Sequence, residues 1–290
     1  MAEAKADGSV PGIVEVKLPT TDPVPAVFDS PHSGIIYPTD FNAVTPIQKL
    51  RQSEDAFIDE LYGAAPENGA TLVACQFSRA YIDPNRAATD LDASLLDGPW
   101  PDPLKPTEKT NKLGIGLVWR LFNDGSSIYN RKLSIAEVKR RIDVYYRPYR
   151  AAVEAALDAT HRRFGRVYHI DCHSMFGMSS VLSPDGPGRK RPDFVLGDRW
   201  GTSCGDDYSR FVKERLEAMG YSVAMNDPYA GGDIVFAYGK PDEKRHSLQI
   251  EINRSLFMDE IAITKHSGFS RIKADLTRLV AAVCDYAKIH

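Results

Sequence analysis

The sequence predicts a single-domain α/β protein with a mixed, mostly parallel central sheet that is flanked by helices. Two observations support this prediction: short apolar runs alternate with longer segments of helical periodicity, and no repeat or low-complexity linker interrupts them. A chain of 290 residues, 43% of them hydrophobic, is long enough for one large core. We expect residues 13–290 to form this domain and the small, polar residues 1–12 to form a flexible N-terminal tail.

The first half of the chain predicts two strands and one helix. The apolar run 24–29 is typical of a buried strand, and the Ser-Pro-His-Ser-Gly sequence after it is typical of a turn. Residues 53–63 place apolar side chains at helical spacing behind a serine in the N-cap position, so they predict an amphipathic helix. A second strand is expected over 70–75. Residues 88–115, rich in Asp, Pro, Lys and Gly, predict a long surface loop.

The second half continues the alternation of strands and helices. Ser134 and Glu137 form a capping box, which predicts a helix that runs to about Phe164 with a kink or break at Pro148. Two further helices are expected at 207–219 and 272–286. Four further strands are expected at 167–171, 194–196, 221–224 and 248–252.

Composition and charge exclude several classes of function. A net charge of −3 gives no field that would attract nucleic acid or an anionic membrane. No run of 18 apolar residues predicts a transmembrane helix, and the N-terminus lacks the apolar stretch of a signal peptide. The four cysteines are widely spaced, as in a reduced protein. We therefore expect a cytoplasmic protein that binds a small molecule and neither nucleic acid nor membrane; the oligomeric state is left open.

Polar clusters follow the predicted strands at the points where several of them end. Ligands of open α/β sheets bind in the crevice beyond the carboxyl ends of the strands. A fold does not need histidines, arginines and carboxylates at these places, so their recurrence indicates a functional site there. The four clusters are 29–34, 83–86, 171–174 and 251–254.

The two histidines of these clusters, His32 and His173, predict a catalytic metal site. Two histidines and one carboxylate leave the fourth position of a zinc ion open for water or substrate. Asp55 is the expected third ligand, with Glu54 as the alternative, and Zn²⁺ or another divalent metal is the expected cofactor. The competing interpretation is that each histidine is only a hydrogen-bonded structural residue.

Five blocks of this sequence together resemble the N-formylglutamate amidohydrolase family: DSPHSG, SRAYIDPNR, HIDCHSM, NDPYAGG and LQIEINRSLFMDE. The resemblance runs from about Pro25 to about Glu260. That family is distantly similar to zinc carboxypeptidases and to the aspartoacylase and succinylglutamate desuccinylase group. The resemblance therefore implies a zinc-carboxypeptidase-like (phosphorylase/hydrolase-like) fold, with His32 and His173 as metal ligands. One departure is Ile35, which stands where the carboxypeptidases place a ligating glutamate.

The resemblance also implies roles for several other side chains. Glu251 is the expected catalytic general base. Amide hydrolysis also needs a group that stabilises the oxyanion, and for this reason Arg79 or Arg254 is expected in that role. Substrate binding is expected from the Asn85-Arg86 pair and from Arg254. The resemblance favours a Gly-rich segment 226–233 with Tyr229 over the pocket, and the alternative is a plain turn.

These roles predict metal-dependent hydrolysis of an N-acyl amino acid, with N-formyl-L-glutamate giving L-glutamate and formate as the first candidate. The alternatives are a carboxypeptidase-like peptidase, a deacylase for another acyl group, and a non-catalytic ligand-binding protein. A serine hydrolase using Ser30, Ser33 or Ser174 is disfavoured because none lies in a GxSxG elbow. Glu251 distinguishes an enzyme from a binding protein, since only an enzyme needs a general base beside the metal.

Overall fold

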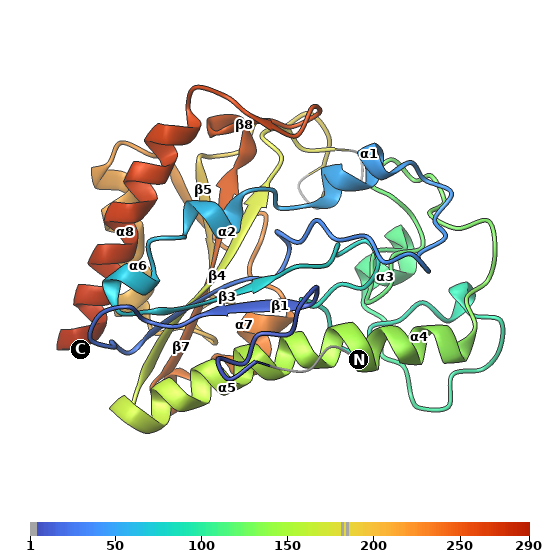
Figure 1. Cartoon of the computed structure of the whole chain (residues 1–290). Helices are drawn as coiled ribbons and strands as arrows, with labels where there is room; N and C mark the ends of the chain where they lie inside the picture. The colour runs from blue at the N-terminus through green and yellow to red at the C-terminus, as the bar shows by residue number, and fades with distance from the viewer. Residues whose placement is uncertain (1–4, 181–182, 184–185) are drawn as a thin grey trace.

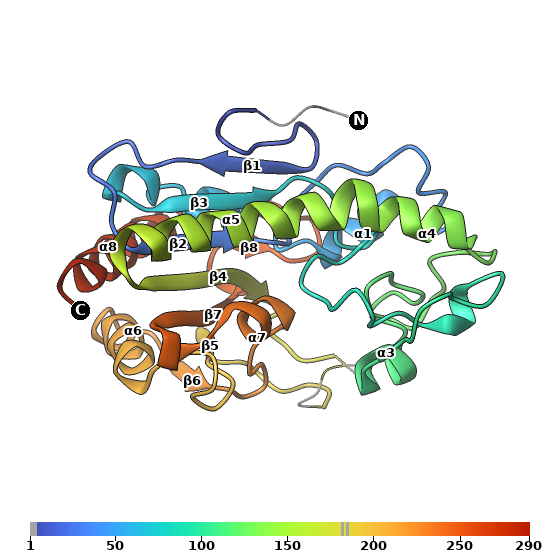
Figure 2. The ribbon, with the colours of Figure 1, turned by 90° about the horizontal axis from the view of Figure 1, so that it is seen from below.

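A computed structural model describes residues 5–180, 183 and 186–290. Its centre is a seven-stranded sheet in the order β1-β3-β2-β4-β7-β5-β6 (Figures 1 and 2). Four neighbouring pairs are parallel, whereas β1 with β3 and β5 with β7 are antiparallel. The sheet is thus mixed and mostly parallel, as predicted. The strands are β1 (Val14–Lys17), β2 (Ala26–Ser30), β3 (Thr71–Cys75), β4 (Val167–Met175), β5 (Phe194–Gly197), β6 (Val223–Met225) and β7 (Arg245–Asn253).

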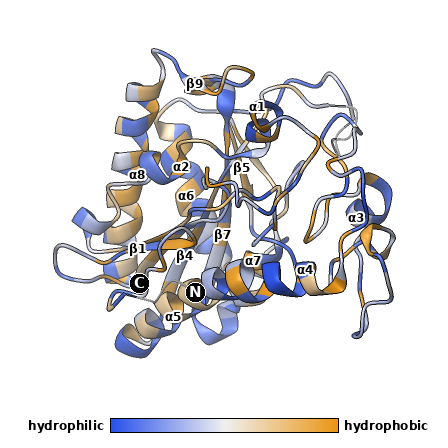
Figure 3. Ribbon diagram, turned by 45° about the vertical axis from the view of Figure 1, so that its right-hand side comes forward, coloured by the Kyte–Doolittle hydropathy of each residue, from blue (hydrophilic) through white to orange (hydrophobic). Residues whose placement is uncertain are grey.

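Helices cover both faces of this sheet and enclose two hydrophobic cores. On one face lie α2 (Ile58–Leu61), α6 (Asp206–Ala218) and α8 (Phe269–Ile289); on the other lie α4 (Ile135–Arg141) and α5 (Arg147–Phe164). The side of α8 that faces the sheet is apolar, with buried residues at helical spacing such as Leu276, Leu279, Val280 and Val283 (Figure 3). No helix among the described residues has the length and apolarity needed to cross a lipid bilayer.

Short elements complete the chain at the edges of these layers. The remaining α-helices are α1 (Ile47–Leu50), α3 (Glu108–Leu113) and α7 (Asp233–Tyr238). A small hairpin joins β8 (Met258–Asp259) and β9 (Thr264–Lys265). Single 3-10 turns are η1 (Arg51–Ser53), η2 (Pro66–Asn68), η3 (Ala93–Leu95), η5 (Pro241–Glu243) and η6 (Arg254–Leu256).

The helix predicted over 53–63 is wrong in its first half. Only Ile58–Leu61 is α-helical; Phe57 has a φ of 67°, and Glu54 is extended with a ψ of 144°. Tertiary contacts override the apolar periodicity here. The backbone N–H of Asp55 donates to the carbonyl oxygen of His32 at 2.9 Å, which holds this segment against the loop after β2.

The long helix after Ser134 begins as predicted but does not break at Pro148. The Ser134 side chain accepts a hydrogen bond from the Glu137 N–H at 3.1 Å, which confirms the N-cap. A π-helical turn, η4 (Ile142–Tyr146), joins α4 to α5 and places Pro148 in the first turn of α5. A π turn is a wider turn inside a helix, so the missing N–H of a proline can be accommodated there without a break.

Two segments expected to be irregular, the N-terminal tail and the loop 88–115, are partly ordered by contacts with distant parts of the chain. The expected tail is packed from Ser9 onward, since Ser9 is buried and its hydroxyl accepts the N–H of Val16 at 2.9 Å. The expected surface loop 88–115 contains η3 and α3 and buries Asp90 and Thr110. All four cysteines lie in described segments as buried free thiols.

Candidate active site

The candidate site lies at the carboxyl ends of three parallel strands. β2 leads directly into the loop that bears His32, β4 bears His173, and β7 bears Glu251. β4 is the parallel neighbour of both other strands, and His173 and Glu251 are direct partners in its register with β7. The register therefore brings groups from distant parts of the chain to one edge of the sheet.

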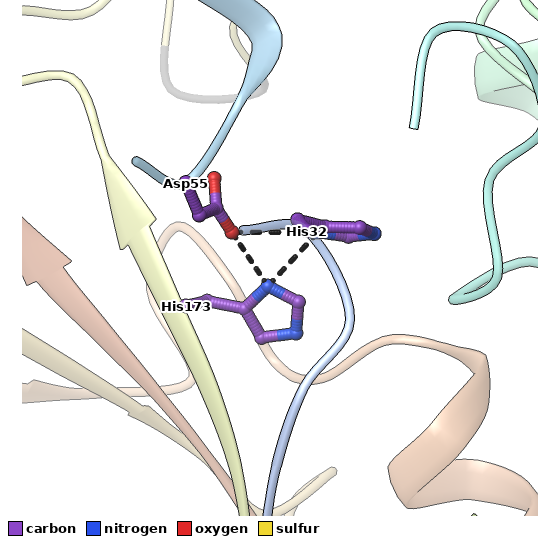
Figure 4. Close-up of side chains that lie close together, drawn as sticks. All are labelled: His32, Asp55 and His173. Atoms are coloured by element: carbon purple, nitrogen blue, oxygen red, sulfur yellow. Dashed lines mark hydrogen bonds and ion pairs between the residues drawn. The ribbon is translucent and has the colours of Figure 1, made fainter. Parts of the chain in front are cut away.

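Two histidines and one aspartate converge at this edge (Figure 4). Oδ2 of Asp55 lies 2.9 Å from Nδ1 of His173 and 3.3 Å from Nδ1 of His32, and the two Nδ1 atoms are 3.1 Å apart. All three side chains are buried. Ligand atoms around a tetrahedral zinc ion are about 3.3 Å from one another, given zinc–ligand distances of about 2.0–2.1 Å. The spacing therefore fits a divalent metal.

A carboxylate stands behind each histidine of this cluster. Nε2 of His32 lies 2.8 Å from Oδ1 of Asp83, and Nε2 of His173 lies 2.7 Å from Oδ1 of Asp171. Metal-ligating histidines commonly donate their second ring N–H to such a carboxylate. Nε2 of His32 can donate to Asp83 in this way, whereas His173 and Asp171 are in ion-pair contact. When both Nδ1 atoms are unprotonated, two nitrogen lone pairs and the Asp55 carboxylate face one another, and they repel unless a cation lies between them.

The electrostatics of the cluster favour positive charge at its centre. Burial alone would lower the pKa of His173, but the Asp171 and Asp55 carboxylates raise it well above its ordinary value. Burial alone would raise the pKa of Asp55, but hydrogen bonds to His173 and His32 and the charge of Arg79 hold it well below its ordinary value. The side chains of His173 and Asp55 can therefore bind either protons or a metal ion.

Asp83 is fixed by partners on three sides. Nη2 of Arg79 donates to its Oδ2 at 2.9 Å, Nε1 of Trp119 donates to the same oxygen at 3.3 Å, and the N–H of Asn85 donates to Oδ1 at 2.9 Å. Arg79 also lies over the Trp119 ring, 5.2 Å from its centroid. These contacts hold the carboxylate that orients His32.

Glu251 lies beside the cluster, and Gln249 holds it. The side chain is only 8% exposed, and burial raises the pKa of Glu251, with the Asp55 charge acting in the same direction. Gln249 Nε2 donates to Glu251 Oε1 at 2.9 Å, while Gln249 Oε1 accepts the N–H of Gly232 at 2.7 Å. Gln249 thereby connects the Gly-rich loop to the carboxylate that we expected to act as general base.

A cavity of about 1000 Å³ opens above the cluster. This volume is typical of a site for a small molecule. The cavity brings together most of the side chains that the sequence singled out. Its lining includes His32, Arg79, Arg86, His173, Tyr229, Glu251 and Arg254.

Comparison with known proteins agrees with this geometry. Residues 24–258 match the family described as N-formylglutamate amidohydrolase. The chain belongs to the N-formylglutamate amidohydrolase family. N-formylglutamate deformylase from Pseudomonas putida is 32% identical over 246 residues, which cover 82% of this chain and 83% of that protein. The crystal structure of N-formylglutamate amidohydrolase from Ralstonia eutropha JMP134 has a TM-score of 0.91 at 45% identity, covering 95% of this chain and 98% of that one.

In this member of the N-formylglutamate amidohydrolase family, Asn85 and Arg254 contact the cluster of His32, Asp55 and His173, the candidate metal ligands. Nδ2 of Asn85 donates to Oδ2 of Asp171 at 3.1 Å and lies 2.9 Å from Nε2 of His173, while its Oδ1 accepts the N–H of Ile234 at 2.8 Å. Nη2 of Arg254 donates to Oδ1 of Asp55 at 2.8 Å. Both side chains, which the sequence suggested as substrate contacts, also position the candidate metal ligands.

The Gly-rich segment is both a turn and part of the cavity wall. Gly231 has a φ of +119°, a conformation that side chains rarely adopt. A Cβ on Gly232 would lie 2.5 Å from Oδ1 of Asn85, so only glycine allows this approach. The turn places Tyr229 at the cavity, where the Arg191 guanidinium lies 5.0 Å from its ring centroid. The segment is therefore a turn in which Tyr229 lines the cavity, and a role of Tyr229 over bound substrate stays a prediction.

Glu54, the alternative ligand, lies away from the histidines. Its Oε1 accepts a hydrogen bond from the Tyr37 hydroxyl at 2.6 Å, and its Oε2 lies 3.4 Å from Nε of Arg51. The three serines considered as nucleophiles also bond elsewhere: Ser30 and Ser33 to each other, and Ser174 to Arg254. Within the described part of the chain, His32, Asp55 and His173 are the one group of such side chains close enough to share an ion.

Proposed function

We propose that this protein is a metal-dependent amidohydrolase that converts N-formyl-L-glutamate and water into L-glutamate and formate. The observation that supports this most is the buried His32–Asp55–His173 cluster beside Glu251 at the base of a large cavity. Membership of a family whose named relatives are N-formylglutamate deformylases and amidohydrolases supports the choice of substrate.

The metal would be held by His32, Asp55 and His173, and Zn²⁺ suits two imidazoles and one carboxylate. When bound, such an ion polarises the scissile carbonyl and lowers the pKa of a coordinated water. The chain's own contribution is to keep the ligands in place. Asp83 holds the imidazole ring of His32 by a hydrogen bond, the charge of Asp171 lies beside the ring of His173, and Arg254 holds Asp55.

Glu251 would move the proton. Its carboxylate accepts a proton from the attacking water as the new C–O bond forms at the formyl carbon. It then delivers that proton to the nitrogen as the C–N bond breaks, which releases the amino group and formate. Gln249 holds one carboxylate oxygen, so the other is available to the reacting water. A pKa raised by burial suits a general base because it lies closer to the working pH.

Arginine side chains would bind the charges of the substrate. Arg79 lies at the cavity and remains charged, since burial alone would lower its pKa but Asp83 and Asp55 raise it. It is therefore suited to stabilise the developing oxyanion. Among the residues that the structure describes, Asp90 is the one ion-pair partner of the Arg86 guanidinium, at 4.0 Å between Nη1 and Oδ2. The guanidinium can therefore form a bidentate contact with a substrate carboxylate. Tyr229 would close over the bound molecule.

The test is a substrate comparison with release of L-glutamate as the readout, since all three substrates give this product. We expect N-formyl-L-glutamate to be hydrolysed faster than the N-acetyl and N-succinyl derivatives of L-glutamate. Faster hydrolysis of N-acetyl or N-succinyl-L-glutamate would assign a deacylase of another acyl group, and C-terminal cleavage of peptides would assign a peptidase. Binding of all three compounds without turnover would assign a non-catalytic binding protein.

The buried free thiols suit the reducing cytoplasm, where we propose that the enzyme works.

A further inference from the structure

The cavity wall carries more basic than acidic side chains, and most of the basic ones already have a carboxylate partner. At the rim, Lys49 pairs with Asp124 and Lys112 pairs with Glu108. Nearer the candidate metal ligands, Arg79 pairs with Asp83 and Arg254 pairs with Asp55. Each of these four cations therefore already has a carboxylate of the protein beside it.

Lys109 differs from these cations. It lies on α3 and lines the cavity, and its side chain is half-buried. No hydrogen bond or ion pair joins it to any other residue that the structure describes. Burial and the nearby guanidinium groups of Arg86 and Arg79 lower the pKa of Lys109 to about 7, against the opposing charges of Asp83 and Glu251. An anion bound among these cations would stabilise the charged form of Lys109.

The fold holds Lys109 in this position through one buried carboxylate. Asp90 accepts the N–H of Thr107 at 2.7 Å and the hydroxyl of Thr110 at 2.5 Å, and these two threonines flank Lys109. The hydroxyl of Thr107 also caps the first turn of α3. Asp90 is the same carboxylate that lies 4.0 Å from Nη1 of Arg86. Asp90 therefore anchors the helix of Lys109 and is also the ion-pair partner of Arg86.

We propose that Lys109 binds the side-chain carboxylate of the substrate and so selects acidic over neutral N-acyl amino acids. This inference rests on the proposed function, because it assumes a substrate with two carboxylates. Arg86 would bind one of them, and Lys109 would bind the other. An ammonium–carboxylate contact in a partly buried site is stronger than a neutral hydrogen bond. The substrate would also supply the carboxylate partner that Lys109, unlike Arg79 and Arg86, lacks among the described residues.

Lys109→Gln tests this, with Lys112→Gln as the matched control because Lys112 lies on the same helix but is exposed and paired with Glu108. Both are assayed on N-formyl-L-glutamate and N-formyl-L-glutamine. We expect Lys109→Gln to raise KM for the glutamate derivative on the order of 10- to 100-fold, with kcat little changed and with the glutamine derivative almost unaffected. Lys109→Arg should restore most of the binding. An equal loss on both substrates, or no loss, would overturn the assignment.

Equilibrium binding separates this inference from the proposed function. Calorimetry with L-glutamate and L-glutamine on the metal-loaded protein does not depend on turnover. Tighter binding of L-glutamate to the wild type, lost in Lys109→Gln and kept in Lys112→Gln, supports the inference even where no formate is released. If the wild type binds the two amino acids equally, Lys109 does not select a carboxylate, whatever reaction the enzyme catalyses.

Discussion

Replacing Glu251 by glutamine removes the charge but almost none of the volume. The structure indicates that the fold will tolerate this change. The new side chain can still present an oxygen to Nε2 of Gln249, which now donates to Oε1 of Glu251 at 2.9 Å. Its amide group then occupies the position of the second carboxylate oxygen, where it can no longer accept a proton.

The expected effects on rate and stability differ in size. Loss of general acid–base catalysis lowers kcat by at least roughly 100-fold, the lower end of the range for such groups, or about 2.7 kcal/mol of activation free energy. The free energy of unfolding should change by less than about 1.5 kcal/mol, because one hydrogen bond is kept and a costly buried charge is removed.

The assay measures formate release, metal content and urea unfolding on one preparation of Glu251→Gln. Glu154→Gln is the control, because Glu154 is exposed on α5 and the chemical change is the same. We expect Glu251→Gln to keep its metal and its fold and to lose turnover, while the control keeps all three. A rate near that of the wild type would refute the role of general base. Loss of metal or unfolding would mean that Glu251 has a structural role.

Three further predictions concern side chains of the site, and a fourth concerns the N-cap of α4. Asp55→Ala should lose the metal and Glu54→Ala should keep it, as measured by metal analysis; the opposite result would exchange the ligand assignment. Asp83→Asn should weaken metal binding by about 10- to 100-fold in a competitive chelator titration, and unchanged affinity would remove its role in orienting His32. The KM for N-formyl-L-glutamate should rise between about pH 6 and pH 8 as Lys109 loses its charge above its pKa of about 7, and Lys109→Arg should abolish this rise; a rise of equal size in that variant would assign it to another group. Ser134→Ala should lower the free energy of unfolding by about 1 kcal/mol without changing kcat, whereas equal stability to urea would show that the N-cap contributes nothing.

The sequence predicted the location of the site because that location depends on local signals. Apolar runs marked the central strands β2, β4 and β7, and polar residues marked the points where they end. Parallel strands bring such ends to one edge of the sheet, so His32, His173 and Glu251 could be expected together. Asp171 lies two residues before His173 on the same face of β4, and this spacing was the available signal for its role behind the ring.

Parts of the site that depend on long-range contacts were not predictable in this way. Asp55 was placed on a helix, but a backbone hydrogen bond to His32 and a left-handed Phe57 make its segment extended. Gln249 shares a strand face with Glu251, and nothing in the sequence indicated that it also bonds the Gly-rich loop. Lys109 lies in a segment expected to be a surface loop, and its place in the cavity results from the bonds that Asp90 makes to the threonines beside it.

We propose above all that hydrolysis depends on a metal held by His32, Asp55 and His173. The most direct test is to strip the purified protein with a chelator, add zinc back in steps, and follow bound metal and formate release from N-formyl-L-glutamate in the same samples. We predict that activity disappears on stripping and returns in proportion to bound metal, up to about one ion per chain, and that Asp55→Ala recovers neither. Full activity in a sample that contains no measurable metal would contradict the account.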